Sequence, residues 1–540
     1  MTAFASQISP TSPGFVQNHA DNLALLDQMR SLEARATAKS DQRRAVFDKR
    51  GQLSPRQRLA ALLDPDMPFV ELCNMANYLV DDPDPATSIP GASVILGIGY
   101  VSGVRALVFV DDAGINAGAS TTKTVDKVLA CLAIAMKQKL PLVHLVESAG
   151  ANLMSYTVEL WAHGGGLFAG LARLSAAGIP VVTILHGAST AGGAYQPGLS
   201  DYVIGVKNNG MAMLAGSALV QAATGERAAD SDLGSAEMHA STTGLVDYLA
   251  ENDAHAIEIA RDVIADLNWN ANTALPPSPA YEPPHFSPDE ITGIVPTDYR
   301  KPYDMRELAA RLVDGSRLRD FKPGHGPATL CLQASVHGYP IGIIANNGPI
   351  DPAGATKVTH FLQLLDQSTT PAIFLNNTTG YMVGLDAEHG GMIKHGAKMI
   401  QAVTNLRSPK LSFYVGASFG AGNYGMCGFA FDPDFLFTWP NAKTGVMGGE
   451  QAASTMEQIA LRTAHRKGTQ PDPDQLATQR AEITAHFDRQ SDAFFTSGRM
   501  LDHGMIDPRD TRHIIAFCLQ TCREARARIL HPNSFGVARP

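Results

Sequence analysis

The sequence predicts two α/β domains in tandem, related by an internal duplication, with an N-terminal helical arm. Three observations predict this fold class. A proline-rich segment divides the 540-residue chain into nearly equal halves. In both halves, apolar runs of about five to seven residues alternate with helical stretches, as buried strands do in βα units. The same motifs recur in the same order about 230 residues apart, a spacing that suits a duplicated domain rather than a solenoid.

Prolines mark the boundary between the halves. Residues 276–288 read PPSPAYEPPHFSP, and prolines fix the backbone while donating no hydrogen bond, so this segment is expected to be an extended linker. We therefore expect an N-terminal domain over 1–275 and a C-terminal domain over 289–540. Within the first of these, residues 21–63 carry apolar side chains at helical spacing among charges, which predicts the helical arm.

The elements of each half follow one plan, in which a strand, a helix and a strand lead to a loop, a further strand and a turn of small residues. In the first half these segments are 104–110, 124–138, 141–146, a loop ending at Gly150, 180–185 and the turn ASTAGGAY at 188–195. In the second half they are 341–345, 356–365, 371–375, a loop ending at Gly380, 409–414 and the turn ASFGAGNY at 417–424.

Composition narrows the function classes. Charged residues make up 18% of the chain, below the roughly 25% of an average soluble protein, which favours an oligomer. The formal charge of -9 argues against general nucleic-acid binding. No apolar run is long enough to span a membrane and no presequence pattern precedes the first helix, so we expect a cytoplasmic protein. The six scattered cysteines predict neither a disulfide framework nor a metal site.

The two glycine turns are the candidate catalytic elements. Backbone N–H groups at the start of a helix carry partial positive charge and can hold an oxyanion during acyl chemistry. The expected donors are the amides of Gly192 and Gly193 in the first turn and of Ala421 and Gly422 in the second. The alternative for either turn alone is that its glycines only permit tight packing between helix and strand. Two turns at matching positions favour the catalytic interpretation.

A serine hydrolase is an alternative from another class. Residues 416–420 fit the G-x-S-x-G nucleophile elbow around Ser418, and Asp432, Asp434, His465 and His503 follow as candidate partners. The corresponding first-half segment, GASTA at 187–191, breaks this pattern and keeps the later glycines. The shared feature is therefore the glycine turn rather than the serine.

The motifs resemble the β, or carboxyltransferase, subunits of biotin-dependent acyl-CoA carboxylases. The branch that acts on methylcrotonyl-CoA and geranyl-CoA shares the sequence GAGNYGMCG at 420–428. The other matching segments are RGQLSPRQR at 50–58, TAGGAY at 190–195, AATGE at 222–226, WPNA at 439–442 and VMGGEQ at 446–451.

The resemblance implies that each half is a crotonase-like (ClpP/crotonase) ββα superhelix. It implies that the first turn holds the enolate oxygen of an acyl-CoA thioester and the second holds the ureido oxygen of biotin. Carboxybiotin would release CO2 in the closed site, and the biotin enolate that remains would remove the substrate proton. The substrate-binding residues it implies are Gly150, Ala151, Ala169, Gly170 and Ala194. The biotin-binding residues it implies are Gly380, Tyr381 and Tyr424.

The resemblance also implies partners. The chain has no nucleotide-binding loop and no Ala-Met-Lys-Met motif for biotin attachment, so a biotin carboxylase and biotin carrier α subunit is expected to bring carboxybiotin to a homohexamer within an α6β6 complex. Alternatives are a propionyl- or acetyl-CoA carboxylase β subunit, a decarboxylase subunit of the same family and a non-catalytic CoA-binding scaffold.

The acyl group is inferred from small residues and from departures from the family pattern. Ala169 and Gly170 leave room where methylcrotonyl-CoA enzymes have a second aromatic residue, which favours a longer acyl group such as geranyl-CoA, unless these residues only allow helix packing. Ser217 and Ala218 stand where relatives commonly have two prolines, and Gln221 where a lysine is usual. These departures predict altered CoA affinity rather than another reaction.

Overall fold

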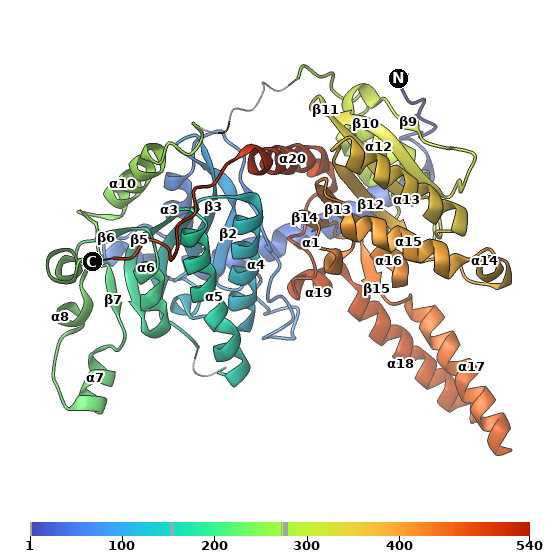
Figure 1. The fold of residues 1–540 in the computed structure, drawn as a ribbon. Coiled ribbons are helices and arrows are strands. Elements are labelled where there is room, and N and C mark those ends of the chain that lie inside the picture. Colours follow the sequence, from blue (N-terminus) through green and yellow to red (C-terminus); the bar gives the residue numbers. More distant parts are fainter. Residues whose placement is uncertain (1–2, 153–155, 272, 274–278, 540) are drawn as a thin grey trace. The chain divides into compact units, whose positions relative to one another are not determined.

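The computed structural model describes residues 3–152, 156–271, 273 and 279–539. The chain forms two compact units (Figure 1). The first-half unit comprises Ser31–Pro276 with Thr521–Pro540, and the second-half unit comprises Pro277–Gln520 with Met1–Arg30. Each unit therefore includes one end of the chain that is distant from the rest of that unit in sequence. The long helices α1 (Pro13–Asp41) and α20 (Thr511–Ala527) each run through a boundary between the units.

The first-half unit contains an eight-stranded sheet in the order β1-β2-β3-β4-β5-β6-β8, with β7 paired to β5. The strands β1, β2 and β3 are antiparallel, and the pairs from β3 onward are parallel. The strands are β1 (Val70–Glu71), β2 (Val94–Val101), β3 (Val104–Asp111), β4 (Leu142–Ser148), β5 (Val181–Thr190), β6 (Tyr202–Val206), β7 (Met211–Met213) and β8 (Tyr248–Ala250).

The second-half unit repeats this topology. Its seven-stranded sheet has the order β14-β13-β12-β11-β10-β9, with β15 paired to β13 as β7 is to β5. The predicted duplication is therefore confirmed. The strands are β9 (Arg319–Asp320), β10 (Thr329–Val336), β11 (Tyr339–Asn346), β12 (Ala372–Thr378), β13 (Lys410–Phe419), β14 (Phe435–Thr438) and β15 (Lys443–Gly445).

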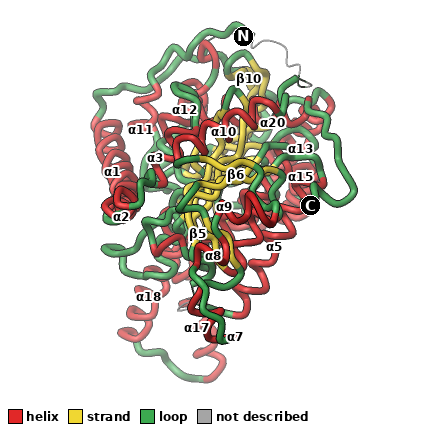
Figure 2. The backbone as a smooth tube through the Cα atoms, turned by 90° about the vertical axis from the view of Figure 1, so that its left-hand side faces the viewer, coloured by secondary structure: helices red, strands yellow, loops and turns green. Residues whose placement is uncertain are grey.

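Helices cover both sheets, which form the interior of each unit (Figure 2). In the first-half unit these are α2 (Arg44–Lys49), α3 (Pro55–Leu62), α4 (Thr122–Gln138), α5 (Val158–Ala176), α6 (Tyr195–Gly198), α7 (Ser217–Thr224), α8 (Asp230–Gly234), α9 (Ala236–Met238) and α10 (Asp253–Asp266). In the second-half unit they are α11 (Ile291–Ile294), α12 (Met305–Leu312), α13 (Pro352–Gln367), α14 (Leu385–His389), α15 (Met392–Asn405), α16 (Gly420–Gly425), α17 (Gly449–Lys467), α18 (Pro473–Ser491) and α19 (Ala493–Gly498). The predicted helical arm is confirmed as α1, with the shorter α2 and α3 after it.

In the core of each unit, side chains from two helices pack on the strands of the sheet. In the first-half unit, Leu59 and Leu62 of α3 and Ile257 of α10 pack on buried strand residues such as Val143 and Val182. In the second-half unit, side chains from α13 and α15 pack on β11 and β12. None of the helices in the described part of the chain combines the length and hydropathy that a bilayer span requires.

The two turn-forming strands are longer than the sequence indicated. We expected strands to end at 185 and 414, but β5 continues to Thr190 and β13 to Phe419. The physical reason is a second pairing partner, because the last residues of β5 pair with β7 and those of β13 pair with β15. Residues 188–190 and 417–419 are therefore strand residues, and the turns begin at Ala191 and Gly420.

Candidate functional site

A bulge precedes each turn. In the first-half unit, Val146 pairs with Leu185 and Ser148 pairs with Ser189, so β5 has two more residues than β4 between these pairs. The register between β12 and β13 shifts by the same amount, from Asn376–Tyr414 to Thr378–Ser418. Such irregularities bend a strand and redirect the residues that follow it. The duplicated bulges direct β5 and β13 into the two turns.

The first turn brings together Gly150, Gly192 and Gly193. Ala191 begins it with a φ of 54°, a left-handed conformation that a side chain disfavours. A Cβ on Gly150 would lie 3.2 Å from the carbonyl oxygen of Thr190, and one on Gly193 would lie 3.0 Å from Ser189 Oγ. The bare backbone of Gly150 therefore packs directly on this turn.

The second turn has the same construction. Gly420 has a φ of 54°, matching Ala191, and Gly380 has a φ of 129°. A Cβ on Gly422 would lie only 2.7 Å from Gly380 Cα. Gly380 and Gly422 therefore form a surface of bare backbone. Here the left-handed position is occupied by glycine, which adopts it without strain.

Both turns can present amide donors to a ligand oxygen. The first N–H groups of a helix have no acceptor within that helix, and these groups belong to Gly192 and Gly193 in the first turn and to Ala421 and Gly422 in the second. The first helical segment spans Ala191–Ala194 and the second spans Gly420–Gly425. Because both are short, the local N–H groups rather than a long helix dipole provide the positive potential.

The remaining predicted acyl-side residues occupy several different places. Ala151 pairs with Ser120, and Ala194 packs on the cluster of Val146, Leu185 and Ala212. Gly170 of α5 faces α4, since a Cβ there would lie 2.7 Å from Leu132 Cδ1. Helix packing thus accounts for the small size of Gly170. The neighbouring Ala169 is half-buried.

Phe168 is the side chain that flanks the first turn. A Cβ on Gly192 would meet Phe168 Cζ at 3.4 Å, and the Phe168 ring contacts the Tyr195 ring edge-on at 6.1 Å between centroids. Tyr195 is half exposed. These two rings are the aromatic surface beside the amides of the first turn.

The predicted biotin-side tyrosines differ in their environments. Tyr381 is half-buried, its hydroxyl donates to the carbonyl of Gly396 at 3.3 Å, and burial raises its pKa. Tyr424 is exposed and packs on Phe431 with 5.5 Å between ring centroids. Its position after the second turn corresponds to that of Tyr195 after the first. Tyr424 can therefore reach a ligand, whereas the Tyr381 hydroxyl is engaged beneath α15.

Ser418 lies in a buried network rather than in an exposed nucleophile elbow. Its hydroxyl donates to Asn376 Oδ1 at 2.9 Å and accepts from Asn423 Nδ2 at 2.8 Å. Asn423 Nδ2 also donates to the Tyr414 hydroxyl at 3.1 Å. The candidate base His503 instead accepts from the backbone amide of Leu436. Asn423, which sequence reasoning did not single out, thus ties α16 to β13 at two points.

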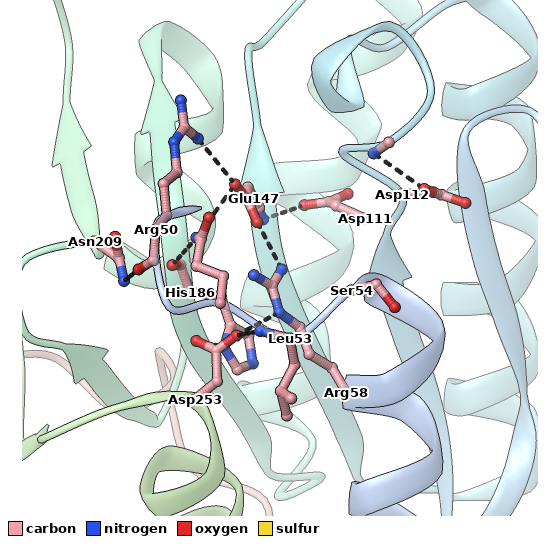
Figure 3. Close-up of polar contacts among 12 residues, drawn as sticks. Arg50, Leu53, Ser54, Arg58, Asp111, Asp112, Glu147, His186, Asn209 and Asp253 are labelled. Carbon is pink, nitrogen blue, oxygen red and sulfur yellow. Dashed lines mark hydrogen bonds and ion pairs between the residues drawn. The ribbon is translucent and has the colours of Figure 1, made fainter. Parts of the chain in front are cut away.

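A charged network lies against the bulge of β5 that precedes the first turn (Figure 3). Arg58 is fully buried and donates to Glu147 Oε2 at 2.6 Å and to Asp253 Oδ2 at 2.9 Å. His186 Nδ1 lies 2.8 Å from Asp253 Oδ1. Sequence reasoning gave no role to Glu147, His186 or Asp253, and its one signal here was the motif at 50–58, which contains Arg58.

Opposing effects set the protonation of this network. Burial, together with the charge of Arg58, lowers the pKa of His186, so the neutral imidazole donates to Asp253 at neutral pH. Burial alone would raise the pKa of Asp253, but the bond from His186 and the charge of Arg58 outweigh it and lower that pKa to about 2. Asp253 therefore stays ionised. In the described part of the chain, no group of three or more His, Cys, Asp or Glu side chains is arranged to hold a metal ion.

Comparisons with known proteins match the whole chain. Residues 48–534 match the family model described as the carboxyl transferase domain. The solved β subunit of geranyl-CoA carboxylase from P. aeruginosa is 44% identical, with a TM-score of 0.93 and coverage of 100% of both chains. A Mycobacterium tuberculosis protein named "Probable biotin-dependent acyl-coenzyme A carboxylase beta2 subunit" is 43% identical over 538 residues, 99% of each chain. The biotin-dependent 3-methylcrotonyl-coenzyme A carboxylase β1 subunit of the same organism is 39% identical over 525 residues, covering 95% of this chain and 96% of the relative.

Proposed function

The chain belongs to the carboxyl transferase domain family, as a β subunit of the biotin-dependent acyl-CoA carboxylases, and on this premise we propose that it carboxylates the γ carbon of a branched unsaturated acyl-CoA. The fold is accordingly crotonase-like in both halves. We favour geranyl-CoA over 3-methylcrotonyl-CoA as the substrate.

The duplicated turn is the observation that carries this proposal. Each turn ends a bulged strand and packs against a glycine from the neighbouring strand's loop, Gly150 in one unit and Gly380 in the other. Amide donors fixed before the reaction stabilise negative charge without reorganising, and one such donor contributes about 2.7–4 kcal/mol to transition-state stabilisation. In the first turn, the amides of Gly192 and Gly193 would hold the thioester oxygen as it gains charge.

The second turn suits a planar polar group such as the ureido ring of biotin. The close approach of Gly422 to Gly380 leaves backbone without side chains, a surface that any Cβ would fill. Biotin, carried by a partner subunit, supplies the carboxyl group that is transferred. In this chain the amides of Ala421 and Gly422 would bind the ureido oxygen, and the exposed Tyr424 would lie beside it.

The aromatic surface beside the first turn supports the choice of acyl group. Phe168 contacts the Gly192 position, and the next residue, Ala169, is small and half-buried. An aromatic residue at 169 would take up space that a longer chain can occupy, at about 0.8 kcal/mol per buried methylene. Gly170 contributes nothing to this argument, because it faces Leu132. The 44% identity to the geranyl-CoA carboxylase β subunit agrees with the choice.

We further propose that the chain forms a homohexamer and works with a biotin-carrying α subunit in an α6β6 complex.

The departures from the family pattern lie on α7, where Ser217, at its first position, donates its amide to Asp230 at 2.7 Å. That hydrogen bond stabilises the first turn of α7, which the two prolines common in relatives would otherwise favour.

The decisive experiment is bicarbonate fixation by the native complex. The chain should copurify with a biotinylated partner and incorporate labelled bicarbonate into geranyl-CoA and, more slowly, into 3-methylcrotonyl-CoA. Fixation only on acetyl- or propionyl-CoA would overturn the substrate assignment, and no fixation by an intact biotinylated complex would overturn the activity.

A further inference from the structure

Glu147 fills the space above the bulge that precedes the first turn. It lies on β4 between the paired residues Val146 and Ser148, opposite the extra residues of β5. A Cβ on Gly187, in the middle of that bulge, would lie 2.5 Å from Glu147 Cδ. The carboxylate therefore rests directly on the backbone of the bulge, and the bulge needs glycine at that point.

Arg58 holds this carboxylate from below. Its Nη1 donates to Glu147 Oε2 at 2.6 Å, and its Nε donates to Asp253 at 2.9 Å. Gln52 Nε2 donates to the carbonyl oxygen of His186 at 2.9 Å, which fixes the first residue of the bulge. The segment around 50–58 thus contacts both the side chain above the bulge and the backbone of the bulge itself.

The turn is attached to this network at both sides. From Gly187, β5 continues through only three residues to the left-handed Ala191 that starts the turn. From Glu147, β4 leads through two residues to Gly150, whose bare backbone packs on Thr190. A shift of Glu147 would therefore displace the turn through two short backbone segments, 187–191 and 147–150.

The second turn is supported by neutral groups instead. Asn377 occupies the position of Glu147 and packs on Gly416 of its bulge. Asn441 Nδ2 donates to the carbonyl of Val415 at 3.1 Å, as Gln52 does to His186. The charged support is thus specific to the turn that would receive the thioester, and it is not required by the fold, because the second unit forms the same bulge without it.

We propose that Arg58 and Glu147 are positioning residues for the first turn: they hold the bulge of β5 so that the amides of Gly192 and Gly193 face the thioester oxygen. This inference rests on the proposed acyl-CoA carboxyltransferase function. The carboxylate alone would disfavour an oxyanion nearby. Arg58 is shared with Asp253, and Arg50 Nη1 lies 3.8 Å from Glu147 Oε1, so the two guanidinium groups together offset the two carboxylates. The pair therefore combines rigid geometry with a compensated charge.

Two conservative variants test this role in the complete complex with its biotin-carrying partner. Glu147→Gln keeps the shape but removes the charge, and Arg58→Lys keeps the charge but loses the planar guanidinium that reaches two carboxylates. Since a misplacement of about 1 Å can cost about 100-fold, we expect kcat to fall roughly 10- to 100-fold in both variants, with the KM for acyl-CoA changed less than threefold.

A matched control comes from another buried ion pair. Arg311 Nη1 contacts Glu307 Oε2 at 2.8 Å, with side-chain exposures of 1% and 5%. This pair lies on α12, in the second-half unit, and neither residue belongs to a bulged strand or to a turn. Glu307→Gln should therefore lower the melting temperature as much as Glu147→Gln does while changing kcat less than twofold.

Hydrogen exchange gives a readout that does not depend on turnover. In Glu147→Gln and Arg58→Lys, amides at 186–195 should exchange faster, while those at 415–424 and those in the Glu307→Gln control should not change. Exchange at 186–195 that equals the wild-type rate, or a kcat loss no larger than that of Glu307→Gln, would overturn the positioning role. An inactive wild-type complex would instead refute the proposed function and leave the exchange result to decide the inference.

Discussion

Gly422→Ala is the change to which the second turn should be most sensitive. The added methyl carbon would lie 2.7 Å from Gly380 Cα, 3.0 Å from Gly380 C and 3.1 Å from Thr378 Cγ2. Carbon atoms in contact prefer about 3.5–4.0 Å, so the turn must retreat by roughly 1 Å. Two of these neighbours are backbone atoms, which cannot rotate away.

A retreat of that size removes the amides of Ala421 and Gly422 from their ligand. Loss of one such donor typically lowers kcat by about 100- to 1,000-fold. We therefore expect Gly422→Ala to reduce kcat for carboxyl transfer by about 100-fold or more. The assay is bicarbonate fixation by the complex, with light scattering and a melting curve to establish native assembly.

The first turn supplies a graded comparison. An added Cβ at Gly193 would lie 3.0 Å from the rotatable hydroxyl of Ser189, and one at Gly192 would lie 3.4 Å from Phe168 Cζ. The expected order of loss is Gly422→Ala, then Gly193→Ala, then Gly192→Ala. Gly198→Ala is the control, since no described atom lies within 4 Å of its added Cβ. A natively assembled Gly422→Ala complex with kcat within about threefold of wild type would refute the reasoning.

Three further variants test other parts of the account. Ala169→Phe should shift kcat/KM toward 3-methylcrotonyl-CoA over geranyl-CoA, and an unchanged ratio would contradict the acyl-pocket argument. Burial lowers the pKa of His186, so the unfolded chain binds more protons below about pH 6.5. As the pH decreases below about 6.5, the free energy of unfolding should therefore fall by up to about 1.4 kcal/mol per pH unit. Urea titrations at several pH values should give a smaller slope of unfolding free energy against pH for His186→Asn than for the wild type. Burial raises the pKa of Asp502 to about 7, so unfolding free energy should fall as pH rises from about 4 to 7. Asp502→Asn should lack that fall. If the slope of unfolding free energy against pH is the same in the wild type and in either variant, the protonation state assigned to that residue is wrong.

The sequence predicted the repeated elements because their periodicity and punctuation are local. Buried parallel strands give continuous apolar runs, and a helix such as α4 begins within two residues of its expected start because Thr121 provides its cap. The ends of β5 and β13 were not predictable in the same way. Small residues such as Ala188 and Ala417 end the apolar runs, and the strands continue because they pair with β7 and β15 and, beyond the bulges, with β4 and β12.

The sites were predictable to different degrees. Gly193 and Gly422 could be found because backbone chemistry leaves a glycine signature at a turn. Glu147 and Asp253 could not, because each is an ordinary acidic residue in sequence and becomes distinctive only when the fold buries both against Arg58. Gly170 is the opposite case, because the sequence suggested a role that the structure does not require. Its small size suggested an acyl pocket, but close packing on Leu132 explains why a glycine is needed there.

The central claim is that two backbone turns each hold one reacting oxygen. A crystal structure of the complex with a non-reacting acyl-CoA and biotin would test it most directly. We predict that the thioester oxygen lies about 2.7–3.1 Å from the amide nitrogens of Gly192 and Gly193, and the ureido oxygen equally close to those of Ala421 and Gly422. A thioester oxygen held by a side chain, or lying away from both turns, would contradict the account.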